Sequence, residues 1–156
     1  MSELFINNAK ACAVTGHRVL EINFDKNNVK KVLLELINNG YDTFLIGMAL
    51  GFDTVCFQLL SEIKKEKDIK IIACIPCPTQ SYKFSKKQKK LYDEMVSTAD
   101  EKIILSPSYD EKCMQRRNKY MVDNCSVLLA YLRRDFGGTV NTVKYAQKKG
   151  IKIIKV

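Results

Sequence analysis

The feature that most constrains the fold of this chain is a regular alternation between short apolar runs and segments with helical periodicity. The apolar runs cover residues 11–14, 43–46, 69–75, 102–105, 127–131 and 151–156. They are almost continuously apolar, as strands are when helices cover both faces of a parallel sheet. Between them, apolar residues recur at the three- and four-residue spacing of an amphipathic helix. The alternation predicts βαβ units and an α/β fold with a mostly parallel sheet.

The helical segments are marked by recognisable ends. Their apolar positions lie within residues 29–37, 55–63, 91–96, 111–124 and 139–149. Asp25 and Ser85 are suited to cap helix N-termini, while Gly40 and Gly150 are suited to end helices. Because parallel strands are joined by right-handed crossovers, we expect a three-layer Rossmann-like sandwich with a doubly wound sheet of about six strands.

Length and composition indicate an ordinary globular domain. We expect the 156 residues to form one domain, residues 1–156. Hydrophobic residues at 46% and charged residues at 28% exclude disordered, collagen-like and coiled-coil chains. The chain has no apolar run near the ~18 residues of a membrane span, and its N-terminus lacks a secretory pattern. We therefore expect a cytoplasmic protein that does not bind membranes.

The net charge points to a polyanionic partner. Lys and Arg number 26 against 17 Asp and Glu, which gives +9 at pH 7. Such a balance suits nucleic acid, a nucleotide or phosphate. The Lys residues are spread over helix faces, so a solvated surface is the alternative explanation, and charge alone leaves both open.

The six cysteines predict reduced thiols in a cytoplasmic protein. Cys74-Ile75-Pro76-Cys77 has the spacing of a thioredoxin-like redox motif, but it ends a strand and does not open a helix. The chain has a single histidine, His17, so zinc ligands are scarce. The sequence therefore predicts no metal site and no cofactor.

Three loops follow predicted strands and contain glycine, at residues 15–18, 47–53 and 133–139. In a doubly wound sheet, ligands bind outside the carboxyl ends of the strands. The second and third loops run directly into helices, where free backbone N–H groups and the helix dipole attract anions. With the guanidinium of Arg18 nearby, this arrangement favours a phosphate-bearing ligand. Neither loop has a dinucleotide or P-loop fingerprint.

Catalytic signals are weaker than binding signals. The candidate general acids and bases are Asp53, His17 and Asp123. Asp53 lies in the first turn of a predicted helix, where a role as N-terminal cap explains it equally well. Arg116 and Arg117 could both supply positive charge, and helical periodicity does not decide which one points into the crevice.

Together these motifs resemble the YpsA-like (DUF1273) group of small bacterial and phage proteins in the SLOG superfamily. That superfamily of Rossmann-like domains also includes the LOG phosphoribohydrolases and the DprA DNA-processing proteins. The resemblance runs over nearly the whole chain from about residue 11. Its motifs are Thr15-Gly16-His17-Arg18, residues 47–53, Ile75-Pro76 with Gln80, Arg117-Asn118 with residues 121–123, and Gly137-Gly138-Thr139 with Asn141, Tyr145 and Ala146.

The resemblance implies a nucleotide-derived ligand of the NAD or ADP-ribose type, and it selects Arg117 over Arg116. The residues carried over from the family are Gly16, Arg18, Gly47, Gly51, Asp53, Arg117, Asn118, Gly137, Gly138 and Thr139. The motifs themselves add His17, Pro76, Gln80 and Asn141 to the predicted ligand-binding residues.

Departures from the LOG hydrolase pattern argue against an enzyme. Asn118 stands where LOG proteins have Lys, and Thr142 stands where they have the catalytic Glu. Asp53 is then the only catalytic candidate. The leading hypothesis is a sensor or regulatory module that binds a nucleotide derivative. The alternatives are a LOG-like N-glycosidic hydrolase and a DprA-like protein that binds single-stranded DNA. The sequence leaves the oligomeric state open, with a homodimer as one option.

Overall fold

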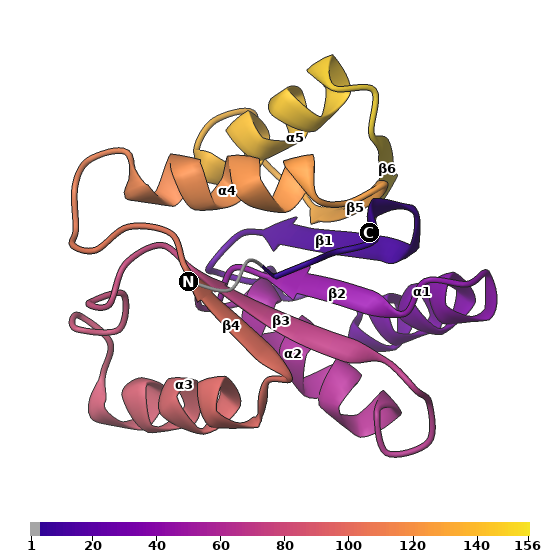
Figure 1. Cartoon of the computed structure of the whole chain (residues 1–156), viewed down its shortest axis with the longest axis horizontal. Coiled ribbons are helices and arrows are strands. Elements are labelled where there is room, and N and C mark those ends of the chain that lie inside the picture. The colour runs from indigo at the N-terminus through magenta and orange to yellow at the C-terminus, as the bar shows by residue number, and fades with distance from the viewer. Residues whose placement is uncertain (1–3) are drawn as a thin grey trace.

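The computed structural model describes residues 4–156, which are built around a six-stranded sheet (Figure 1). The strands are β1 (Ala11–Gly16), β2 (Thr43–Ile46), β3 (Lys70–Ile75), β4 (Glu101–Ile104), β5 (Val127–Tyr131) and β6 (Lys152–Lys155). Their order in the sheet is β4-β3-β2-β1-β5-β6, and all neighbouring strands run parallel. The chain starts at β1, builds outward to β4, and then crosses back to place β5 on the other side of β1. The switch point therefore lies between β1 and β5.

Helices cover both faces of the sheet (Figure 1). The helices are α1 (Lys26–Asn38), α2 (Phe52–Ile63), α3 (Lys86–Thr98), α4 (Cys113–Asp123) and α5 (Gly138–Lys148), and a 3₁₀ turn η1 (Asn8–Lys10) precedes β1. The first three pack on one face, and α4 and α5 pack on the other. This architecture confirms the predicted three-layer Rossmann-like fold. None of the helices described over residues 4–156 is both long and apolar enough to cross a membrane.

The strand side chains alternate between two apolar clusters. In β1, Cys12 and Val14 face the layer of α1 to α3, whereas Ala11 and Ala13 face α4 and α5. Successive side chains of a strand point to opposite faces, so a strand covered on both sides must be apolar throughout. This is why the central strands appear in the sequence as continuous apolar runs.

The helix N-termini fall into two groups. Asp25 caps α1 by accepting a hydrogen bond from the N–H of Asn28 at 3.1 Å, and Ser85 forms a capping box with Gln88 at the start of α3. Both predicted caps are confirmed. In contrast, α2 and α5 begin after Gly51 and Gly137, whose φ angles are +80° and +101°. Glycine has no side chain with which to cap the first N–H groups. In α2 the N–H of Phe52 donates to the carbonyl of His17 at 3.1 Å instead. In α5 the N–H of Asn141 is the first to bond back to Gly137, so the N–H groups before it remain available to a ligand.

Candidate functional site

A cavity of about 470 Å³ opens at the carboxyl ends of the strands, at the switch point between β1 and β5. Its walls come from the segments that follow β1, β2 and β5 and from the inner face of α4. It brings together most of the residues that the sequence predicted. These are Gly16, His17, Arg18, Gly47, Asp53, Arg117, Asn118, Gly138 and Thr139.

The other predicted residues lie outside this cavity. Gln80 contacts the loop that forms one wall of the cavity. Its Nε2 donates to the carbonyl of Gly47 at 2.9 Å, and its Oε1 accepts from the hydroxyl of Tyr92 at 2.9 Å. Pro76 is buried at the end of β3. Asn141 lines a second, smaller cavity between α4 and α5. Gln80 therefore positions the loop after β2 and does not itself face the space.

Three predicted glycines are required by packing within the protein. A Cβ on Gly47 would lie 2.7 Å from Nη1 of Arg117, and one on Gly16 would lie 2.5 Å from the Cβ of Phe52. A Cβ on Gly51 would collide with the backbone of the loop after β1. Gly138 differs, since among the described residues no atom beyond its chain neighbours and the backbone of its own helix lies within 4 Å of its would-be Cβ. The space in front of Gly138 is therefore open to a ligand.

Arg117 is a buried side chain that bonds to several segments around the cavity, and 6% of its surface is exposed. Its Nη1 donates to the carbonyl of Gly47 and, at 3.4 Å, to that of Cys74, while its Nε donates to Oδ1 of Asn118 at 2.7 Å. These bonds join the ends of β2 and β3 to α4. Burial lowers the pKa of Arg117, and the nearby carboxylate of Asp53 opposes that shift. Most of its N–H groups are engaged within the protein, so Arg117 acts on the cavity mainly through its charge and through the shape it imposes.

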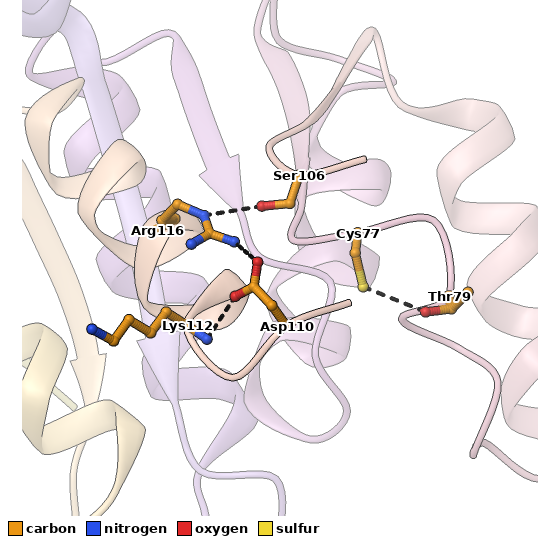
Figure 2. Close-up of polar contacts among 6 residues, drawn as sticks. All are labelled: Cys77, Thr79, Ser106, Asp110, Lys112 and Arg116. Atoms are coloured by element: carbon orange, nitrogen blue, oxygen red, sulfur yellow. Dashed lines mark hydrogen bonds and ion pairs between the residues drawn. The ribbon is translucent and has the colours of Figure 1, made fainter. Parts of the chain in front are cut away.

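Arg116 is not among the residues that line the cavity, and its side chain contacts Ser106 and Asp110 (Figure 2). Its Nε donates to Oγ of Ser106 at 3.0 Å, and its guanidinium pairs with Asp110. Asp110 also accepts from the backbone N–H of Lys112 at 2.8 Å. Arg116 thus fastens the loop between β4 and α4, and the structure places Arg117 in the cavity wall.

Asp53 is a buried carboxylate whose hydrogen bonding is incomplete. It is 5% exposed, and its Oδ2 accepts from the N–H of Ala49 at 3.1 Å. Its Oδ1 has no partner in the described part of the chain. Burial raises the pKa of Asp53 to about 6, although Arg117 and Arg18 act to lower it. Gly51, and not Asp53, is the N-cap of α2, so the capping explanation is wrong.

His17 and Arg134 direct two donors at the same space. Nε2 of His17 accepts from the backbone N–H of Arg133 at 2.8 Å, so a neutral ring carries its proton on Nδ1. Nη2 of Arg134 lies 3.3 Å from that Nδ1. Burial, followed by Arg134 and Arg133, lowers the pKa of His17, which keeps the ring neutral at pH 7. Two N–H groups that converge in this way can both donate to one anionic oxygen.

The predicted set of ligand-binding residues left out part of this wall, and one predicted catalytic candidate lies elsewhere. Arg134, Met114 and Met121 line the cavity but were not among the predicted ligand-binding residues. Arg134 belongs to a glycine loop that was recognised, but nothing in the sequence fixed its direction. Asp123, a candidate acid or base, accepts from the hydroxyl of Tyr145 at 2.8 Å on the outer surface and lies outside the cavity.

The six cysteines are free thiols buried in the fold. Cys77 lies 3.5 Å from Oγ1 of Thr79, sulfur to oxygen (Figure 2). Burial raises the pKa of Cys74 to about 12, so its thiolate form is scarce at neutral pH. These features make the Cys74–Cys77 motif part of the core.

Comparisons with known proteins bear on the family and the fold of the chain. A family model described as YspA SLOG family matches residues 12–153. YoqJ, an uncharacterized SPβ prophage-derived protein of Bacillus subtilis, is 32% identical over 140 residues, covering 79% of this chain and 80% of that protein. A UPF0398 protein of Bacillus licheniformis is 24% identical over 157 residues, covering 90% and 86% of the two chains.

Solved structures of DprA share the fold. DprA of Streptococcus pneumoniae superposes with a TM-score of 0.70 at 18% identity, covering 94% of this chain and 50% of the other. DprA of Helicobacter pylori, described for its binding of single-stranded DNA, gives 0.69 at 16% identity and covers 95% and 65%. The present chain thus spans about half the length of the pneumococcal protein.

Proposed function

The chain belongs to the YspA SLOG family, and from that premise we propose that its switch-point cavity binds a nucleotide-derived ligand of the NAD or ADP-ribose type. The protein then acts as a sensor or regulatory module. One observation carries the proposal. Among the described residues, the N–H groups of His17 and Arg134 on one side of the cavity have no acceptor between them, and on another wall the side chain of Asp53 has a buried carboxylate oxygen without a donor.

The donor side suits a phosphate. It combines Nδ1 of His17, the guanidinium of Arg134 and the N-terminus of α5, where Gly138 leaves room for close approach. Hydrogen bonds to an anion are about twice as strong as those between neutral groups. Because the N–H of Arg133 holds the ring neutral, His17 contributes a directed donor and no net charge. Arg18 and Arg117 add positive charge to the same cavity.

The acceptor side suits a hydroxyl. Oδ1 of Asp53 lacks a partner among residues 4–156 and belongs to a side chain that lines the cavity. A buried carboxylate oxygen left unpaired costs free energy, and a ribose hydroxyl would supply the missing donor. A phosphate at one wall and a hydroxyl at another describe a ribose phosphate, which nucleotides and ADP-ribose share.

A LOG-like hydrolase is the second candidate, and Asp53 is the observation that favours it. A carboxyl group with a pKa of about 6 is suited to general acid–base catalysis near neutral pH. Thr142, at the position of the LOG glutamate, instead donates its hydroxyl to the carbonyl of Gly138 at 2.8 Å. Free base released from AMP or NAD, and lost in Asp53→Asn, would establish turnover.

Binding of single-stranded DNA is the third candidate, favoured by the net charge of +9. Stacking platforms require exposed aromatic rings. Tyr92 is buried and bonded to Gln80, and Phe84 packs edge-on against it at 5.7 Å. Tyr82 remains exposed in this segment, at 74%. Of these three aromatic rings, that of Tyr82 is therefore the one exposed for stacking on a base.

The test is isothermal titration calorimetry with ADP-ribose, NAD, AMP and an oligothymidine, using two His17 variants. His17→Gln can accept from Arg133 through its amide oxygen but lacks the donor at the Nδ1 position. His17→Asn keeps a donor there and loses the acceptor. Since a hydrogen bond to a charged group contributes about 1.5–3 kcal/mol, we expect Gln to weaken nucleotide binding by about ten- to hundredfold.

We expect the His17→Asn variant to retain most of the affinity for the nucleotide, once the lower stability of this variant is taken into account. Equal loss in both variants would show that His17 does not donate to the ligand. Binding of the oligothymidine alone, with a steep dependence on salt, would replace the nucleotide proposal with the DNA-binding one.

A further inference from the structure

A second cavity of about 210 Å³ lies between α4 and α5, beside the first. We propose that it holds the base of the ligand, so that the molecule spans both cavities with its phosphate in the first. This inference rests on the proposed function and specifies its ligand as a 5′-nucleotide whose base is recognised. The cavity is lined by Gln115, Asn118, Lys119, Asn141, Thr142 and Tyr145.

The two cavities are joined through Asn118, which lines both. Oδ1 of Asn118 accepts from Nε of Arg117 at 2.7 Å, and this bond fixes the orientation of the amide. Its two Nδ2 hydrogens are then left to donate to a ligand. A residue held in this way at the boundary can contact a molecule that passes from one cavity to the other.

The first turn of α5 spans the same boundary. Gly138 lines the first cavity, while Asn141 and Thr142 line the second. At 1.5 Å of rise per residue, Gly138 and Thr142 are about 6 Å apart along the helix axis. A single ribose ring covers this kind of distance between a phosphate and a base. The hydroxyl of Thr142 bonds to the carbonyl of Gly138 at 2.8 Å, which holds this turn in shape.

The chemistry of the two cavities differs in the way that the two ends of a nucleotide differ. The first contains Arg18, Arg117 and Arg134. The second contains three carboxamides, from Gln115, Asn118 and Asn141, with one cation, Lys119, and no carboxylate among its described lining residues. Carboxamides offer both donors and acceptors, and Asn and Gln pair with the polar edge of adenine in this manner.

Tyr145 provides a flat wall that is held in position. Its hydroxyl donates to Oδ1 of Asp123 at 2.8 Å, and the ammonium groups of Lys119 and Lys149 lie over its ring at 5.6 and 5.7 Å from the centroid. Of these two cations Lys119 lines the cavity, so a planar base that packs against the ring takes the place of its ammonium group. The ring wall and the carboxamides together match a heterocyclic base better than a second phosphate.

The experiment compares AMP with ribose 5-phosphate by calorimetry, in the wild type and in two variants of α5. Asn141→Ala removes a carboxamide from the second cavity. Gln147→Ala removes an exposed carboxamide from the same helix outside both cavities and is the matched control. We expect AMP to bind more tightly than ribose 5-phosphate. Loss of one neutral hydrogen bond should weaken AMP by about two- to tenfold in Asn141→Ala.

The same change should leave ribose 5-phosphate binding unaltered, and Gln147→Ala should change neither ligand. Equal affinity for AMP and ribose 5-phosphate, with no effect of Asn141→Ala, would overturn the base site while the proposed phosphate site stands. Binding of neither compound would overturn both proposals. A tenfold loss of both ligands in Asn141→Ala would also contradict the base site, because the residue would then act on the phosphate.

Discussion

Replacing Asp53 by Asn should make the free protein more stable at neutral pH while removing its ligand affinity. The carboxylate is 5% exposed, and Oδ1 has no partner within residues 4–156. Asn keeps the size of the side chain and the acceptor for the N–H of Ala49, but it carries no charge. The substitution therefore removes a buried charge and, with it, the acceptor that we assign to the ligand.

The expected change in the free energy of unfolding follows from the pKa of Asp53. Burial raises the pKa of Asp53 from 3.8 to about 6, a difference of about two units, and each unit corresponds to 1.36 kcal/mol. Between those two pH values the folded protein binds more protons at this site than the unfolded chain does. The contribution of Asp53 to stability therefore falls as the pH rises from about 4 to 6. Above pH 6, the ionised group costs about 3 kcal/mol.

The assay is urea unfolding of the wild type and Asp53→Asn at several pH values between 3.5 and 8. We expect the two proteins to match below about pH 4, and the variant to be more stable by about 1–3 kcal/mol above pH 6. A difference that does not change with pH, or a wild type that is the more stable protein at pH 7.5, would refute the reasoning.

Asp100 provides a control, because its pKa is shifted in the opposite direction from that of Asp53. Burial acts to raise its pKa, but hydrogen bonds from Lys64 and from the N–H of Ile71 outweigh it and lower the pKa. A lowered pKa gives stability that is present above the unfolded value and is lost as the pH falls. Asp100→Asn should therefore be the less stable protein at pH 7, and its difference from the wild type should shrink in acid.

Four further predictions concern packing, ligand access, charge and thiol reactivity. Gly47→Ala should lower the free energy of unfolding by about 1–3 kcal/mol because its Cβ meets Arg117. Gly138→Ala should change it by less than about 1 kcal/mol yet weaken ADP-ribose binding measured by calorimetry. Arg117→Ala should cost about 3 kcal/mol in urea unfolding because it removes a buried charge partner, whereas Arg116→Ala, in an exposed pair, should cost less than about 1 kcal/mol. The six buried cysteines should react with Ellman's reagent only after denaturation, and rapid reaction of the native protein would contradict the assigned burial.

Most of the fold could be predicted from the sequence because the sheet is covered on both faces. The apolar run at residues 43–46 coincides with β2, and that at residues 127–131 coincides with β5. Cap residues added further precision, since Asp25 and Ser85 bond as their positions implied. The order of the strands required the right-handed crossover rule as well.

The location of the site was predicted from the sequence, but the role of each residue in it was not. Loops after strands place His17 and Gly138 at one edge because the ends of parallel strands meet there. The roles of Gly47 and Arg117 could not be foreseen, because a contact across the cavity wall leaves no local sequence pattern. For the same reason, the sequence did not reveal that Arg134 faces His17.

The most direct test of the central claim is a titration of the ¹⁵N-labelled protein with ADP-ribose, followed by the backbone amide shifts. The account predicts saturable changes at Ala49, Arg133, Gly138 and Thr139, around the switch-point cavity. It predicts little change along the exposed face of α3. No saturable shifts, or shifts centred on residues 83–90, would contradict a nucleotide site at the switch point.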